Sequence, residues 1–263
     1  MKTRLVLCLG LLHLSWCPFA YPANGPTLDQ ILLRLADQVK EFEFSLPDFV
    51  CKERITSGEV VAGYFRQQVF FDSVFIGTQN KDEEGRPFTE SREIKTIDGR
   101  EAEKGRQPEV PFFFGGGFSS VLDATFGGKN IPYHTYKLAG TETIDDRPAL
   151  VIKFATKDGQ KDVSFEFLGS RFISRDTGTA WIDPESMRVV RLERRYLNVP
   201  PPYGVVTVSI EYSAVVLNGK TFWMPKTVVV EETQNHSRKP VGARYIAEYS
   251  DYQKFDVSTR IKY

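Results

Sequence analysis

The sequence of 263 residues is poor in the residues that build metal sites and disulfide frameworks, since it contains only three cysteines and three histidines. Cys8 and Cys17 lie close to the N-terminus, so removal of that segment leaves Cys51 alone. A single cysteine forms neither an intramolecular disulfide nor a cysteine-rich metal site. The rest of the chain must therefore be stabilised by its hydrophobic core.

An excess of charge of one sign is also missing. Lys plus Arg and Asp plus Glu both number 34, so the formal net charge is zero. Nucleic-acid-binding proteins carry a basic patch that neutralises phosphates, and no basic stripe occurs in this sequence. The charges between Arg86 and Arg106 alternate in sign, which is typical of the solvated edge of a hairpin. We therefore expect no nucleic-acid partner.

Long hydrophobic runs are limited to one, from Leu5 to Leu14, which is shorter than the roughly 20 residues that a membrane-spanning helix needs. A basic flank precedes the run, and small residues and prolines follow it, as in a secretory signal peptide rather than a buried helix. We predict that residues 1–23 are a signal peptide cleaved at Ala20 or Ala23. Residues 24–263 then form a single exported domain.

A lipid anchor is the alternative at this terminus. The segment Leu14-Ser15-Trp16-Cys17 has the outline of a bacterial lipoprotein cleavage box, in which the cysteine is acylated. The position before that cysteine ordinarily holds Gly, Ala or Ser, and Trp16 departs from this pattern. We therefore expect a protein of the periplasm or cell envelope with no lipid on Cys17 and no transmembrane span after signal removal.

The remaining sequence predicts one helix followed by strands. Apolar residues recur at spacings of three and four over residues 28–44, Thr27 can cap this helix, and Pro47 follows it. Turn signals such as Asn218-Gly219 separate runs rich in β-branched and aromatic residues, and the short connections favour an antiparallel meander. About eleven strands are expected, over residues 64–76, 90–97, 136–144, 149–155, 163–167, 179–182, 188–196, 205–216, 221–224, 226–232 and 244–255.

The predicted strands have one apolar face and one polar face. Val206, Val208 and Ile210 alternate with Thr207 and Ser209. A helix of about seventeen residues is about 25 Å long and does not cover the apolar face of such a wide sheet. The sheet must curl, hold a ligand or meet a partner. We predict a mainly β fold: a curved antiparallel sheet or half-open barrel with one N-terminal amphipathic helix and a short lid helix.

A known family shares part of this pattern. The segment from Gly178 to Asp183, Gly-Thr-Ala-Trp-Ile-Asp, is followed by a turn and by the strand Val189 to Glu193, and this pair resembles the outer-membrane lipoprotein carrier family, the LolA-like fold. The segments Phe222 to Pro225 and Ala247 to Phe255 are similar to exported bacterial proteins related to that fold, which have no assigned function. The resemblance implies a half-open barrel, closed by helices, that holds the acyl chains of lipoproteins. It carries over no residue of the handover mechanism.

The stretch from Val110 to Phe126 is the predicted lid. It contains five phenylalanines and three successive glycines, which let the segment move or pack tightly, and the aromatic rings need an apolar surface. The alternative is a short helix from Ser119 that plugs the barrel end as ordinary core. The candidate lid or ligand-lining residues are Phe112, Phe113, Phe114, Phe118, Leu122, Phe126 and Trp181.

No catalytic signature is present in the sequence. His134 and His236 lack the spacing of metal ligands, and no Gly-x-Ser-x-Gly elbow occurs. Asp183 and Glu185 lie in a turn, where aspartate is expected to bond the backbone. Cys51 lies in an apolar segment and is expected to be buried rather than nucleophilic. We therefore expect no enzyme, no cofactor and no metal, and a hydrolase is the remote alternative.

The sequence predicts an exported, non-catalytic protein that binds a lipid or lipoprotein acyl chain in an apolar cavity. The alternative is a cell-envelope interaction module with a solid β core that binds a protein or peptide partner. The two hypotheses differ in internal volume, because a carrier needs space for an acyl chain and a module is packed solid.

Overall fold

A computed structural model describes residues 25–79, 88–103, 114, 118–160, 163–167, 170–199, 201, 203–234 and 241–255. The predicted signal peptide, Cys17, Phe112, Phe113 and His236 lie outside the described residues. The helices are α1 (Leu28–Ser45), α2 (Ser120–Phe126) and the short 3-10 helix η1 (Ile131–Tyr133). The strands are β1 (Phe49–Val61), β2 (Tyr64–Gln79), β3 (Phe88–Ile97), β4 (Arg100–Glu101), β5 (His134–Ile144), β6 (Arg147–Thr156), β7 (Val163–Phe167), β8 (Ser170–Ser174), β9 (Asp176–Ile182), β10 (Val189–Tyr196), β11 (Val205–Leu217), β12 (Lys220–Gln234) and β13 (Val241–Lys254).

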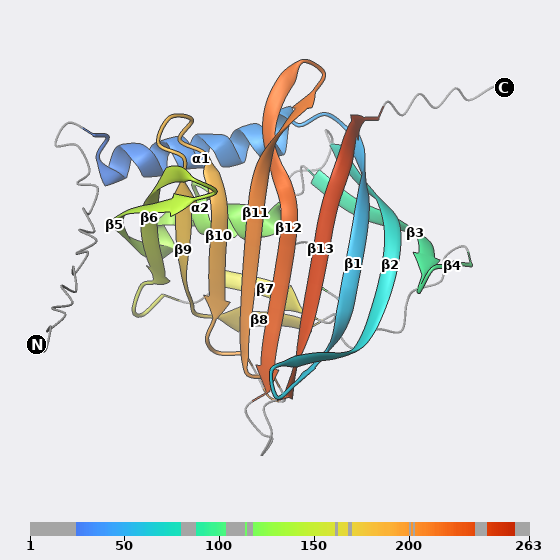
Figure 1. Cartoon of the computed structure of the whole chain (residues 1–263). Coiled ribbons are helices and arrows are strands. Elements are labelled where there is room, and N and C mark those ends of the chain that lie inside the picture. The colour runs from blue at the N-terminus through green and yellow to red at the C-terminus, as the bar shows by residue number, and fades with distance from the viewer. Residues whose placement is uncertain are drawn as a thin grey trace, which may run out of the picture.

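One antiparallel sheet contains 11 of these strands, in the order β4-β3-β2-β1-β13-β12-β11-β10-β9-β6-β5. The strands β7 and β8 form a separate hairpin. Nearly all neighbours in the sheet are consecutive in the chain, and the pairing of β1 with β13 brings the first and last strands together (Figure 1). The sheet ends at β4 and at β5, so the mainly β prediction is confirmed in its open form, and the sheet is not a closed barrel.

The strand predictions differ from the structure at four places: β1, β4 and β8 were missed, and β12 was predicted as two strands. The strand β1, which pairs with β2 and β13, was missed because its buried positions include the polar residues Glu53 and Ser57, which interrupt the apolar alternation. Residues 221–224 and 226–232 belong to a single strand, β12. Pro225 lies opposite Tyr212 at a register shift, where a proline is tolerated within a strand.

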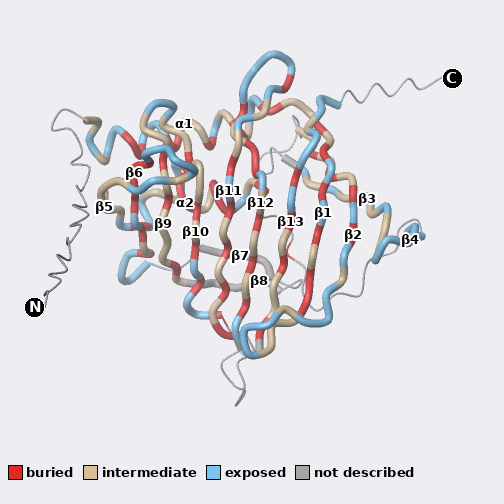
Figure 2. The backbone as a smooth tube through the Cα atoms, in the orientation of Figure 1, coloured by how far each residue is buried: buried red, intermediate tan, exposed pale blue. Residues whose placement is uncertain are grey.

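The helix α1 begins at a capping box and covers one face of the sheet. Thr27 Oγ1 accepts a hydrogen bond from the Gln30 amide at 3.3 Å, and Gln30 Oε1 accepts one from the Thr27 amide at 2.8 Å. Figure 1 places α1, α2 and the β7–β8 hairpin on the same side of the sheet. We call this side the inner face and the opposite side the outer face. Buried and less buried residues alternate along the strands between the two faces (Figure 2).

The inner face also buries charged residues. Asp176 Oδ2 lies 2.5 Å from Arg194 Nε, and Asp176 Oδ1 lies 3.0 Å from His134 Nε2; the side chains of all three residues are fully buried. At the other end of the face, Glu53 Oε1 lies 2.8 Å from Arg92 Nε. Buried charges are tolerated only when they are paired. The Glu53–Arg92 pair joins β1 to β3, and Asp176 joins the consecutive strands β9 and β10 to His134 of β5.

Gly178, the first residue of the segment Gly-Thr-Ala-Trp-Ile-Asp, has a packing role. Gly178 lies opposite Phe154 on β6 and opposite Arg194 on β10. A Cβ atom at this position would lie 2.2 Å from the Glu193 carbonyl oxygen and 2.3 Å from the Phe154 ring. The ring therefore occupies the space that any larger residue would need.

Candidate functional site

Phe118 lies at the centre of an aromatic cluster on the inner face. Its side chain is 1% exposed, and its ring centroid lies 4.7 Å from that of Phe75, 5.5 Å from that of Phe49 and 5.4 Å from that of Tyr249. These partners come from β2, β1 and β13. On the side of α1, the Phe42 ring lies 6.1 Å away. Phe118 therefore fills the space between α1 and one half of the sheet.

The helix α2 continues from Phe118 toward the other half of the inner face. Phe126 is fully buried, and its ring lies 5.9 Å from Tyr136 on β5 and 6.2 Å from Phe154 on β6. Leu122 is buried between these two contacts, and Phe114 is buried as well. Four of the predicted lid or lining residues are thus gathered in one hydrophobic core. The short helix predicted from Ser119 is confirmed by α2.

Polar contacts attach α2 to the sheet at both ends. Glu90 Oε1 accepts hydrogen bonds from the Ser119 amide at 3.3 Å and from the Ser119 hydroxyl at 3.2 Å. The Tyr136 hydroxyl donates to the Thr125 carbonyl at 2.5 Å, and Arg194 Nη1 donates to Thr125 Oγ1 at 3.5 Å. A helix of seven residues is marginal on its own, so these contacts and the buried rings determine its position.

Glu43 on α1 is influenced by the charge of Asp123 on α2. Burial and the negative charge of Asp123 together raise the pKa of Glu43 to about 7, against the opposing charge of Lys129. Burial also raises the pKa of Asp123. Protonation of Glu43 near neutral pH therefore removes a repulsion between the two helices.

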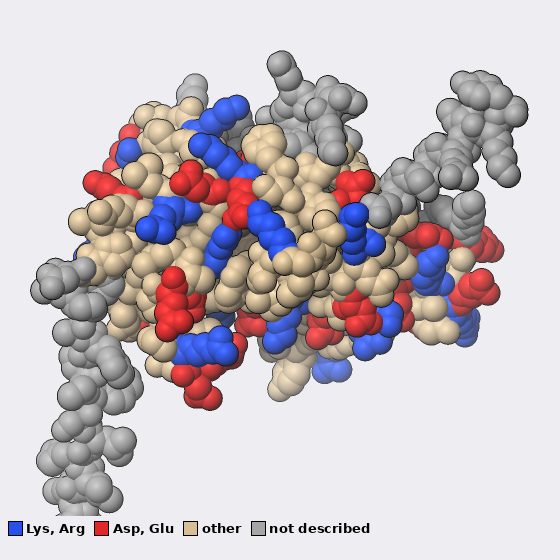
Figure 3. Space-filling view, turned by 90° about the horizontal axis from the view of Figure 1, so that it is seen from above, with Lys and Arg blue, Asp and Glu red and all other residues tan. Residues whose placement is uncertain are grey.

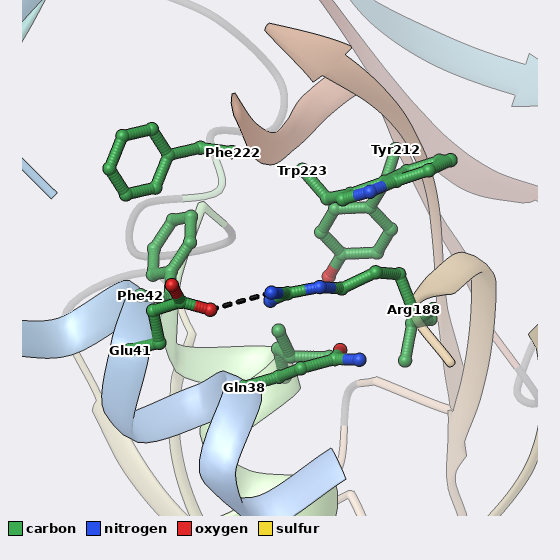
Figure 4. Close-up of a pocket in the computed structure, with 9 residues that line it drawn as sticks. Gln38, Glu41, Phe42, Arg188, Tyr212, Phe222 and Trp223 are labelled. Atoms are coloured by element: carbon green, nitrogen blue, oxygen red, sulfur yellow. Dashed lines mark hydrogen bonds and ion pairs between the residues drawn. The ribbon is translucent and has the colours of Figure 1, made fainter. Parts of the chain in front are cut away.

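A pocket opens at the rim of the inner face, between α1 and the ends of β10, β11 and β12 (Figure 4). We call it the rim pocket. Its volume is about 350 Å³ with the open mouth included, and the free space inside is about 20 Å³, enough for one water-sized group. The lining residues are Gln38, Glu41, Phe42, Leu122, Arg188, Val189, Tyr212, Phe222 and Trp223.

Glu41 joins α1 to two turns at this rim. Its carboxylate lies 2.6 Å from Arg188 Nη2 beside the β9–β10 turn and 2.7 Å from Lys220 Nζ at the start of β12. Hydrogen bonds from Lys220 and Arg188 lower the pKa of Glu41. Gln38 Nε2 donates to the Met187 carbonyl in the same β9–β10 turn. Viewed from above, Figure 3 shows basic and acidic side chains interspersed across the visible face.

Tyr212 forms the base of the rim pocket. It is 7% exposed, and its hydroxyl has no hydrogen-bond partner among the described residues. Figure 4 shows this hydroxyl directed toward the guanidinium of Arg188. Burial raises the pKa of Tyr212, so the hydroxyl stays protonated and is available as a donor.

Trp181 is not brought together with the other predicted lining residues. Its neighbours Ala180 and Ile182 are buried on the inner face, and Trp181 points to the outer face. Its indole Nε1 donates to Glu142 Oε2 at 2.7 Å, and the Arg191 guanidinium lies 5.1 Å from the centre of its ring system. A groove of about 810 Å³, with its open mouth included, lies on this outer face; its lining residues are Arg191, Glu193, Thr207, Ser209, Glu211, Thr227, Val229 and Glu231.

Those residues considered for catalysis that the structure describes are either hydrogen-bonded within the fold or buried. The ring nitrogens of His134 contact Asp176 and the Asn130 carbonyl. Asp183 Oδ1 accepts from the Glu185 and Ser186 amides and caps its turn. Burial raises the pKa of the Cys51 thiol above its usual range. Within the described part of the chain, no group of three or more His, Cys, Asp or Glu residues is placed to bind a metal, and no helix is long and apolar enough to cross a membrane.

The sequence interpretation missed the rim pocket. Tyr212 continues the apolar alternation of Val208 and Ile210, and nothing in the local pattern distinguishes its hydroxyl from ordinary core. Glu41 and Arg188 are separated by 147 positions, and only the packing of α1 on the sheet brings them together.

Solved structures of three proteins resemble this fold at low identity. A LolA superfamily protein from Nitrosomonas europaea is 13% identical, with a TM-score of 0.39 over 88% of this chain and 96% of that chain. An outer membrane lipoprotein-sorting protein domain from Vibrio parahaemolyticus is 11% identical, with a TM-score of 0.42 over 88% and 93%. A DUF1329 family protein from Desulfovibrio piger is 11% identical, with a TM-score of 0.38 over 87% and 91%.

Two of these structures are described as a LolA superfamily protein and as a lipoprotein-sorting protein domain, and the likeness of this chain to them is one of fold. No family model matches the sequence, and no curated protein matches it. The likeness concerns overall architecture and transfers no residue, ligand or activity to this chain.

Proposed function

We propose that this protein is an exported, non-catalytic carrier that holds a lipid or lipoprotein acyl chain between its helices and the inner face of the sheet. In this proposal residues 1–23 are a signal peptide, and the mature domain works in the periplasm or cell envelope. The observation that carries the proposal is the position of Phe118, whose ring occupies the centre of the inner aromatic surface although it comes from the short segment that leads into α2.

The packing of α2 supports its role as a replaceable cover. Phe118 and Phe126 are buried against apolar rings of the sheet, and an acyl chain offers the same kind of contact. The polar attachments of α2 are few and lie near its two ends, at Ser119 and Thr125. Displacement of α2 would therefore expose the apolar rings of Phe49, Phe75 and Phe154, together with the buried Arg194 that contacts Thr125.

The carrier and a solid module respond differently to two matched substitutions. Phe118→Ala removes part of the cover, and Phe49→Ala removes part of the wall beneath it; both rings are buried in the same cluster. Each change is expected to lower the free energy of unfolding by about 3 to 5 kcal/mol. For a carrier, Phe118→Ala strengthens the binding of palmitate, because less cover has to be displaced, whereas Phe49→Ala weakens it.

The experiment begins with the mature protein purified from a bacterial envelope. Its native mass is compared before and after organic extraction, and the affinity for palmitate is then measured for the wild type and both variants. A mass loss equal to a lipid, together with opposite changes in affinity, supports the carrier. A bare mass and no palmitate binding by any of the three proteins would contradict it and favour the interaction module.

A further inference from the structure

The buried hydroxyl of Tyr212 is a polar group that the contacts within the described part of the chain do not explain. Buried polar atoms in proteins are nearly always hydrogen-bonded, and this hydroxyl has no partner among the described residues. It lies on the inner face of β11 and points into the rim pocket (Figure 4). A site that holds a hydroxyl in this position is suited to a ligand that supplies an acceptor.

The space beside this hydroxyl limits the ligand atom that can reach it. The free volume of about 20 Å³ admits a single small group such as an oxygen atom. The surrounding walls are largely apolar, with Phe42 from α1, Leu122 from α2 and Phe222 from β12. The pocket therefore fits one polar oxygen at the end of an apolar chain.

The rim pocket adjoins the aromatic cluster, because Phe42 belongs to both. Phe42 lines the pocket and also lies 6.1 Å from Phe118, measured between ring centroids. Leu122 lines the same pocket from one turn further along the chain than Phe118. A chain whose polar end contacts Tyr212 would thus pass beneath α1 toward the centre of the inner face.

The charges at the mouth favour an electron-rich oxygen. Arg188 and Lys220 both lie beside Glu41, so two cations share one carboxylate. The Arg188 guanidinium lies between Glu41 and the hydroxyl of Tyr212 in Figure 4. A second anion at this place would complete the charge balance.

We propose that the rim pocket binds the carbonyl end of an acyl chain. The Tyr212 hydroxyl donates a hydrogen bond to a carbonyl or carboxylate oxygen, Arg188 lies beside the same oxygen, and the hydrocarbon extends past Phe42 and Leu122. This inference rests on the proposed carrier function and specifies where and by what chemistry the ligand is oriented. The shared chemistry covers free fatty acids and the ester or amide carbonyls of acylated lipids and lipoproteins.

The test compares three probes of equal chain length in three proteins. The probes are palmitate, methyl palmitate and 1-bromohexadecane, which lacks the carbonyl group, and each is measured by competition with a fluorescent fatty acid. The proteins are the wild type, Tyr212→Phe and Tyr245→Phe, a control that changes a second buried tyrosine of the inner face outside the rim pocket. We expect Tyr212→Phe to weaken palmitate binding about tenfold and to leave 1-bromohexadecane unchanged.

Each outcome separates this inference from the carrier function. Palmitate binding that is equal in Tyr212→Phe and the wild type would overturn the carbonyl site, with an ordered water as the occupant, and would leave the carrier standing. No binding of either probe to the wild type would overturn both. A tenfold loss for methyl palmitate as well as palmitate assigns the carbonyl oxygen, and a loss confined to palmitate assigns the carboxylate.

Discussion

Asp176 carries a negative charge that is buried on the inner face and contacts two other buried residues, Arg194 and His134. Its carboxylate is fully buried and lies 2.5 Å from Arg194 and 3.0 Å from His134, and it also accepts a hydrogen bond from the Thr156 hydroxyl. Burial raises the pKa of Asp176, but the hydrogen bond from His134 and the charge of Arg194 outweigh burial and lower it. Asp176→Asn keeps the shape of the side chain and removes its charge.

The expected cost follows from the charge that remains. Arg194 stays cationic and fully buried after Asp176→Asn, and breaking a buried ion pair in this way costs about 3 to 5 kcal/mol. This is a large part of the about 5 to 15 kcal/mol by which a domain is stable. A second substitution, Arg194→Met, removes the orphaned charge and is expected to recover a large part of the loss.

The assay is urea unfolding at pH 7, with the slope compared between variants so that a change of the unfolded state is recognised. Asp158→Asn is the matched control, because Asp158 also pairs with an arginine, Arg175, at 2.6 Å, but its side chain is 97% exposed. The control should change stability little or not at all. A cost of Asp176→Asn below about 1 kcal/mol would refute the reasoning.

The pH dependence provides a second check of the same charge. The pKa of Asp176 is lower in the folded protein than in the unfolded chain, so its contribution to stability is present above the unfolded value. It is lost as the pH falls through the folded value. Asp176→Asn should therefore flatten the acid limb of the stability curve, and an unchanged limb would contradict the pairing.

Three further predictions concern other parts of the fold. The pKa of Glu43 is about 7 in the folded protein and 4.5 ordinarily, so the free energy of unfolding should fall by about 1 to 3 kcal/mol as the pH rises between these values. Glu43→Gln should abolish this fall, which is measured by thermal unfolding at a series of pH values. Gly178→Ala should cost about 1 to 3 kcal/mol, because its Cβ meets the Phe154 ring, and an unchanged melting temperature would contradict this contact. Trp181→Ala should cost only about 1 to 2 kcal/mol, since the indole lies on the outer face; a core-sized loss of 3 to 5 kcal/mol in urea unfolding would place it inside.

Local patterns were sufficient for much of the architecture. The capping residues and apolar spacing of α1 define that helix, and Asn218 and Gly219 adopt positive φ angles in the turn between β11 and β12, as their turn signal predicted. The alternation along β11 assigned its inner face correctly. These features depend on interactions between residues close in the chain, so the sequence pattern is enough to predict them.

The candidate site depends on contacts that no local pattern contains. The sequence pattern predicted the short helix α2, but this pattern fits a lid as well as a plug. Only the position of Phe118 against β1, β2 and β13 defines which surface the segment covers. Trp181 was predicted to be one of the lid or ligand-lining residues. The pleat of β9 instead directs it to the outer face.

The sequence by itself determined the mainly β class, the N-terminal helix, the turns and the polarity of most strand faces. Tertiary structure alone decided that β1 joins β13, that His134 of β5 lies beside Asp176 of β9, and that Glu41 of α1 holds the rim at which Tyr212 is buried. The physical reason is the separation along the chain of the residues that interact. Secondary structure follows from neighbours a few residues apart, whereas a buried charge or hydroxyl takes its role from side chains brought together by strands far apart in the chain.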